Sequence, residues 1–136
     1  MIFLDTNVVS EPLRKQPDPR VMAWLVRHDG ELCLPTVTIA EIAFGIARIR
    51  DDDRAPRLTD GLDKLRRRFA GRIYGLSEAA ALAYGEIMGR ASREGRPMSP
   101  LDGMIAAIAK NNGGRLATRN LADFSTTGLD LVSPWD

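Results

Sequence analysis

The sequence is poor in the residues from which many functional sites are built. Its one cysteine, Cys33, excludes an intramolecular disulfide framework and a zinc site made of cysteines. Its one histidine, His28, argues against zinc chemistry and against acid–base catalysis by histidine. No stretch approaches the ~20 consecutive apolar residues that cross a bilayer. The 19 basic and 18 acidic residues leave a formal net charge of +1, so the overall charge does not indicate a nucleic-acid partner.

The length and composition are typical of one globular domain, which we place at residues 1–136. Hydrophobic residues make up 44% of the chain and charged residues 27%, both close to globular averages. A chain of this size buries roughly two-thirds of its extended surface, which is enough for a core of its own. The first apolar run stops at Asp5 and follows no basic residues, unlike a targeting segment. We therefore expect a cytoplasmic protein with no membrane partner.

Short apolar runs alternate along the chain with segments of helical periodicity. The run Ile2-Phe3-Leu4 is uniformly apolar, as in a parallel strand that is covered on both faces. Asp18 before Pro19, and Ser77 before a long periodic segment, mark two helix starts. The alternation predicts an α/β fold with a mainly parallel sheet of about five strands. The expected strands are residues 2–4, 32–34, 73–76, 115–118 and 129–132, and the expected helices are 8–14, 19–28, 38–50, 58–69, 78–93 and 101–112.

Four acidic residues stand where an expected strand ends or an expected helix begins: Asp5, Glu41, Asp102 and Asp123. Each has a structural explanation when it is taken alone. Asp5 can cap the helix that follows it, and Asp123 can form a turn. The other two fit capping boxes, which start from Thr38 for Glu41 and from Ser99, with Pro100 next to it, for Asp102.

Taken together, the four carboxylates indicate a metal site. In a parallel sheet the ligand site lies outside the carboxyl ends of the strands, where such side chains can converge. An oxygen-only set without paired histidines or cysteines selects Mg²⁺ or Mn²⁺ over zinc. Mg²⁺ keeps part of its water shell, so it can bind a phosphodiester and activate a water molecule. The pattern therefore predicts metal-assisted hydrolysis of a phosphodiester.

Four segments that carry these residues resemble the motifs of PIN-domain ribonucleases, in the same order. They are Leu4–Glu11 (LDTNVVSE), Ile39–Ile42 (IAEI), Leu101–Ala107 (LDGMIAA) and Ala117–Phe124 (ATRNLADF), and Pro134-Trp135 matches a common family ending. The resemblance covers nearly the whole chain. It is strongest to the VapC toxin branch with its FitB-like members.

This resemblance implies an α/β/α sandwich of the PIN type and roles for the acidic residues. Asp5 and Asp102 would be direct ligands of Mg²⁺ or Mn²⁺, and Glu41 would hold the metal directly or through water. Either Asn120 or Asp123 fills the fourth position of the site, and the number of metal ions stays open with it. Glu41 or Asp123 would position or deprotonate the attacking water.

The resemblance also implies supporting residues and partners. Thr6, Asn7, Thr118 and Asn120 would orient the carboxylates or the water through hydrogen bonds. The chain would be the endoribonuclease toxin of a type II toxin–antitoxin module and would form a homodimer. A cognate antitoxin would cover the acidic cleft with its tail, and DNA would be contacted only through the antitoxin. The alternative is a chain that acts mainly as the antitoxin-binding partner in a DNA-binding autorepressor complex, with little nuclease activity.

The segment of residues 54–72 is locally basic, with seven basic residues against two acidic ones. Such a segment is either a solvated helix face or a rim that contacts phosphates. Our hypothesis is that its centre, Arg66, Arg67 and Arg68, guides RNA toward the acidic residues. The near-neutral charge of the whole chain would then combine an acidic cleft with a basic remainder.

Overall fold

The first strand of the chain lies in the centre of a five-stranded sheet. The computed structural model describes residues 1–136, and its strands run in the order β3-β2-β1-β4-β5. Every pair of neighbouring strands is parallel, as the uniformly apolar runs predicted. The strands are β1 (Ile2–Leu4), β2 (Leu32–Pro35), β3 (Ile73–Tyr74), β4 (Arg115–Ala117) and β5 (Leu131–Val132).

The register of the central strands places Asp5 at the carboxyl edge of the sheet. Phe3 pairs with Cys33 of β2 on one side, and Leu4 pairs with Ala117 of β4 on the other. The backbone N–H of Asp5 donates to the Ala117 carbonyl at 2.9 Å, which continues the ladder by one residue. Asp5 therefore leaves the sheet at its centre, where ligands bind in parallel α/β folds.

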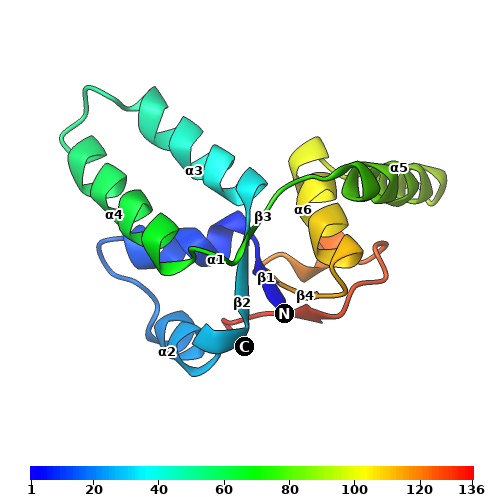
Figure 1. Cartoon of the computed structure of the whole chain (residues 1–136), viewed down its shortest axis with the longest axis horizontal. Helices are drawn as coiled ribbons and strands as arrows, with labels where there is room; N and C mark the ends of the chain where they lie inside the picture. The colour runs from blue at the N-terminus through cyan, green and yellow to red at the C-terminus, as the bar shows by residue number, and fades with distance from the viewer.

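Helices cover both faces of the sheet, so the predicted α/β/α sandwich is confirmed. Figure 1 shows α1 to α4 on one side of the strands and α5 and α6 on the other. None of the six helices combines the length and hydrophobicity needed to cross a membrane. The helices are α1 (Thr6–Ser10), α2 (Pro19–Arg27), α3 (Thr36–Arg48), α4 (Ala55–Arg68), α5 (Glu78–Arg93) and α6 (Pro100–Asn111), with 3-10 turns η1 (Glu11–Leu13), η2 (Asp29–Glu31) and η3 (Leu121–Phe124).

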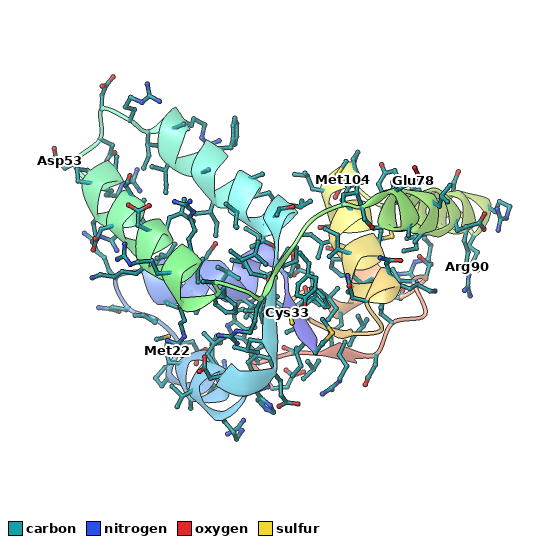
Figure 2. The ribbon with its side chains drawn as sticks, in the orientation of Figure 1. Met22, Cys33, Asp53, Glu78, Arg90 and Met104 are labelled. Carbon is teal, nitrogen blue, oxygen red and sulfur yellow. The ribbon has the colours of Figure 1, made fainter.

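Side chains that alternate along each strand divide the core into two layers. Ile2 and Leu4 of β1 pack with residues of α1 to α4, whereas Phe3 between them packs with residues of α5 and α6. Cys33 belongs to the second layer and lies in the middle of the molecule (Figure 2). It is a small buried side chain, as its apolar strand indicates. The strands are thus covered on both sides, as a parallel sheet requires.

Several boundaries differ from the sequence-based expectation. The helix expected from residue 58 begins at Ala55, with Pro56 in its first turn, and the helix expected from residue 8 begins at Thr6. The strands expected at 73–76 and 129–132 are each two residues shorter. Asp18 and Ser77 cap their helices as predicted, since each side chain accepts a hydrogen bond from the first helical turn.

The capping box predicted from Thr38 to Glu41 is wrong. Helix α3 begins two residues earlier, at Thr36, so Thr38 lies inside the helix. Thr38 is fully buried, and its hydroxyl donates to the Leu4 carbonyl at 3.0 Å. The hydroxyl therefore attaches α3 to the end of β1 and does not cap the helix, which leaves the Glu41 carboxylate free for another partner.

Candidate active site

Both carboxylate oxygens of Asp5 are held in place. The side chain is only 5% exposed. Its Oδ1 accepts a hydrogen bond from the Thr6 backbone N–H at 2.8 Å, which makes Asp5 the N-cap of α1. Its Oδ2 accepts from the Thr118 hydroxyl, also at 2.8 Å. Asp5 is thus both the predicted helix cap and a fixed acidic group at the centre of the sheet edge.

Thr118 links Asp5 to the loop that follows β4. It is fully buried, and its Oγ1 accepts a hydrogen bond from the Asn120 backbone N–H at 3.0 Å while it donates to Asp5. Asn7 holds the same loop from the other side, because its Oδ1 accepts from the Arg119 backbone N–H at 3.3 Å. The side chain of Asn120 is exposed and makes no hydrogen bond. The loop is therefore fixed mainly through Thr118 and Asn7.

Glu41 reaches the site through Thr6. The Thr6 hydroxyl donates to Glu41 Oε1 at 2.8 Å, although the two residues are 35 positions apart. The hydrogen bond from Thr38 to the Leu4 carbonyl fixes the position of α3 relative to the end of β1. Glu41 lies nearly one turn further along the same helix, so this bond also positions Glu41. Sequence reasoning missed this role of Thr38, because its distance from Glu41 matched a capping box.

The other two acidic residues come from the opposite layer. Asp102 is in the first turn of α6, and its backbone N–H donates to Ser99 Oγ at 3.2 Å. Ser99 is therefore the predicted N-cap, with Pro100 at the first helical position. Asp123 lies exposed in η3, just beyond the loop that Thr118 fixes.

The charges of these carboxylates act on one another. Burial raises the pKa of Asp5, and the charges of Glu41 and Asp123 raise it further, whereas hydrogen bonds from Thr118 and Thr6 work in the opposite direction. Burial also raises the pKa of Asp102, with contributions from the charges of Asp5 and Asp123. No basic side chain offsets this repulsion at either group.

The chemistry of these four carboxylates fits a hard divalent cation. All the ligands on offer are oxygens, and a cation would relieve the repulsion among them. In this structure no three carboxylates are close enough together to enclose an ion. Mg²⁺ needs only one or two protein carboxylates beside its waters, so an enclosed cage is not required.

A polar pocket of about 480 Å³ opens beside Asp102 and Asp123. The α5–α6 loop forms one wall of this pocket and the segment after η3 forms another. Sequence reasoning did not single it out, because its other wall, the α5–α6 loop, carries no motif. Its lining residues are Gly95, Arg96, Pro97, Met98, Ser99, Asp102, Ala122, Asp123, Ser125 and Thr126.

A comparison with known families identifies the family of the chain. The family model of the PIN domain matches residues 2–128. The chain belongs to the PIN-domain family. The five-stranded parallel sheet and its two helical layers are therefore those of a PIN domain, as the four motifs predicted.

Curated relatives match this PIN domain over nearly its whole length. The plasmid stability protein StbB of Pseudomonas syringae pv. tomato is 38% identical and covers 100% of this chain and 99% of its own length. The toxin FitB of Neisseria gonorrhoeae is 37% identical, with 99% of both chains covered. The VapC ribonuclease Y4jK of Sinorhizobium fredii is 36% identical, with 100% and 99% covered. The VapC and FitB branch expected from the motifs is confirmed, and with it the class of toxin nucleases.

Two solved structures contain a similar chain. The crystal structure of FitAcB from Neisseria gonorrhoeae matches with a TM-score of 0.91 at 37% identity, over 99% of both chains. A structure of FitAB bound to an IR36 DNA fragment matches with a TM-score of 0.92 at 36% identity, over 100% of this chain and 96% of that one. The backbone of this PIN domain is thus close to that of the matching chain in both structures.

The structure does not bring the predicted RNA-guiding arginines to the acidic residues of this PIN domain. Arg68 forms an ion pair with Asp29 at 2.8 Å, and Asp29 precedes β2 at the amino end of the sheet, opposite the edge that carries Asp5. Arg66 pairs with Asp63 on its own helix at 3.5 Å, and Arg67 is exposed. Their contact with RNA stays a prediction.

Proposed function

We propose that this chain is a divalent-metal-dependent endoribonuclease, the toxin of a type II toxin–antitoxin module that acts in the cytoplasm. The observation that carries the proposal is the fixed carboxylate of Asp5 at the centre of the sheet edge, which interacts electrostatically with three further acidic residues and with no basic side chain that offsets their repulsion. The names of the full-length relatives, a VapC ribonuclease and the toxin FitB, support the same function.

Asp5 and Asp102 are the proposed direct ligands of Mg²⁺ or Mn²⁺, with Glu41 holding the ion directly or through water. When bound, the ion would polarise the phosphoryl oxygen and lower the pKa of the attacking water. The hydroxyl of Thr118 keeps one oxygen of Asp5 in a fixed orientation, and the hydroxyl of Thr6 does the same for Glu41. These two threonines therefore prepare the acidic edge before RNA arrives.

Asp123, and not Asn120, is the proposed fourth acidic position. The charge of Asp123 acts on both Asp5 and Asp102, whereas the Asn120 side chain contacts none of the carboxylates through a hydrogen bond. Asp123 also lines the polar pocket, so a substrate can approach it. These observations support Asp123 as the proposed acceptor of the proton of the attacking water, with Glu41 as the alternative carboxylate for that step.

The proposed partners are an RNA substrate, a second copy of the chain and an antitoxin. Large apolar side chains stay exposed on three helices, with 67% of Phe44 on α3, 71% of Leu82 on α5 and 43% of Leu101 on α6. Exposed apolar side chains of this size mark contact surfaces in other proteins, and here they support a homodimer. The FitAB structure with DNA supports an antitoxin partner that brings the chain to DNA.

The alternative function, an antitoxin-binding partner of a DNA-binding autorepressor with little nuclease activity, uses the same partners. The arrangement of the acidic residues favours the nuclease. Carboxylates whose charges raise one another's pKa are typical of catalytic sites, and metal-assisted hydrolysis uses such groups to hold the ion.

Cleavage of total RNA with mapping of the cut sites tests this proposal. We expect the purified chain to cut RNA with Mg²⁺ and to stop when EDTA is added. Asp5→Asn should abolish cleavage, because it removes a ligand charge and keeps the volume and the helix cap. Asp53→Asn is the matched control, since Asp53 is exposed at the far end of the α3–α4 loop (Figure 2). Equal cutting by Asp5→Asn would show a contaminating nuclease or a different site.

A further inference from the structure

Arg96 is the one basic side chain that lines the polar pocket beside Asp102 and Asp123. Its guanidinium extends from the α5–α6 loop to η3, where Nη2 donates to the Ala122 carbonyl at 3.5 Å. It forms no ion pair, although two carboxylates line the same pocket. The long single hydrogen bond leaves most of its N–H donors available for a ligand.

The backbone of Arg96 is fixed even though its side chain is exposed. Gly95 ends α5 in the left-handed conformation, with φ of 70°. The N–H of Gly95 donates to the Ser92 carbonyl, and the N–H of Arg96 donates to the Ala91 carbonyl at 2.9 Å. These two bonds form a Schellman motif, which holds the start of the side chain in one position. Arg96 therefore projects over the pocket from a rigid turn.

The chemistry of the pocket suits the sugar–phosphate backbone of RNA. A guanidinium presents a planar fork of donors that binds a phosphate through two hydrogen bonds. The hydroxyls of Ser99, Ser125 and Thr126 add neutral polar groups to the lining, and no aromatic side chain is present on which a base could stack. A volume of about 480 Å³ is that of a site for a molecule of nucleotide size.

We propose that this pocket binds the nucleotide next to the scissile phosphate, and that Arg96 contacts the phosphodiester of that nucleotide. The proposal rests on the proposed function, in which Asp102 would help to hold the metal and Asp123 would accept the proton of the attacking water. Arg96 bonds to Ala122, the neighbour of Asp123, so its guanidinium lies at the side of the reacting group. Arg96 is a substrate-binding residue that sets the position of the RNA strand along the acidic edge.

Salt-dependent RNA binding tests this role without relying on cleavage. Binding of a short fluorescein-labelled oligouridine is followed by anisotropy over a series of KCl concentrations in EDTA, which keeps the RNA intact while Asp5 stays unchanged. Arg96→Gln should weaken binding about two- to fivefold, the range of one exposed charge pair. It should also reduce the slope of log K against log salt by about 0.7, because one phosphate contact on a single strand is lost. Arg96→Lys should keep the slope, since it keeps the charge.

Arg27→Gln is the matched control, because Arg27 is exposed at the end of α2, just before the amino end of β2. It removes the same charge from the chain, so it shows what net charge alone does. An Arg96→Gln variant with the affinity and slope of the Arg27→Gln variant would overturn the proposal. Cleavage by the wild-type chain is scored separately: its absence contradicts the nuclease, and an unchanged salt slope in Arg96→Gln contradicts the pocket.

Discussion

The hydrogen bond from Thr118 to Asp5 allows the ionisation of Asp5 to be followed through the free energy of unfolding of the chain. The substitution Thr118→Val keeps the shape of the side chain and removes its hydroxyl. Asp5 Oδ2 then loses a partner at 2.8 Å, inside a site where Thr118 is fully buried and Asp5 is 5% exposed. Water has little access to replace the lost bond.

The expected loss of stability is about 1.5–3 kcal/mol at pH 8, the range for a hydrogen bond to a charged group. With an m-value of about 2 kcal/mol/M, this corresponds to a fall of roughly 1 M in the urea midpoint. The backbone N–H of Asn120 also loses its acceptor, but Asn120 is exposed and water can bind there. The bond to Asp5 therefore dominates the change.

The loss should shrink as the pH falls. The hydroxyl stabilises the ionised carboxylate, so the pKa of Asp5 is lower with threonine than with valine at position 118. The stabilisation by the hydroxyl is therefore complete above the pKa that Asp5 has in the variant. It declines as the pH falls from the Asp5 pKa of the variant to the lower Asp5 pKa of the wild type, which burial still raises above 3.8. Below that pKa only a neutral hydrogen bond of about 0.5–1.5 kcal/mol remains.

Urea denaturation of wild type, Thr118→Val and Thr118→Ser at a series of pH values from 8 down toward 4 measures this effect. Thr118→Ser keeps the hydroxyl and should follow the pH dependence of the wild type. A loss of stability in Thr118→Val that stays constant across the series would refute the reasoning, because it would show that Asp5 does not carry the charge that the bond stabilises.

Three further predictions concern other parts of the chain. Asp5→Asn should raise the melting temperature at pH 7.5 without metal, because the raised pKa of Asp5 means that its ionised form disfavours folding above pH 3.8. Mg²⁺ at about ten times its Kd should raise the melting temperature of the wild type by about 4 °C and leave that of Asp5→Asn unchanged. Calorimetry measures both effects. Glu11→Gln should cost about 1–3 kcal/mol in urea denaturation at pH 7, because the Glu11 carboxylate is 3% exposed and accepts hydrogen bonds from Arg14 and the Asp18 backbone; a neutral result would contradict its structural role. Phe44→Glu should convert a homodimer to a monomer in light scattering with little change in melting temperature, and an unchanged mass would place the dimer surface elsewhere.

The fold could be predicted where the decisive contacts are local. Asp18 and Ser99 cap helices through hydrogen bonds to residues two and three positions away, so a short window of sequence contains the whole interaction. The start of α3 could not be predicted in this way. The hydroxyl of Thr38 bonds to a carbonyl 34 positions earlier, and this tertiary contact prevails over a capping pattern that looks complete in sequence.

The acidic site was predictable as a set of residues but not as a geometry. Asp5 and Asp123 follow apolar strands, and parallel strands end at one edge, so their proximity follows from the fold class. The contact that brings Glu41 to this edge passes through Thr6 across 35 positions, and no local pattern signals it. Arg96 lies in a pocket whose walls come from two separate loops. The burial of Glu11 could not be predicted either. Buried glutamates are rare, so the residue type alone predicts an exposed side chain.

The distance in sequence between Asp5 and Thr118 has a consequence for folding during translation. The ribosome makes Asp5 before the hydroxyl that fixes it, which follows 113 residues later. The central strand β1 likewise waits for β4 before its second edge is paired. Asp5 and Glu41 are therefore synthesised well before Asp102, Thr118 and Asp123. The acidic edge can form only after β4 and the loop that follows it have been made.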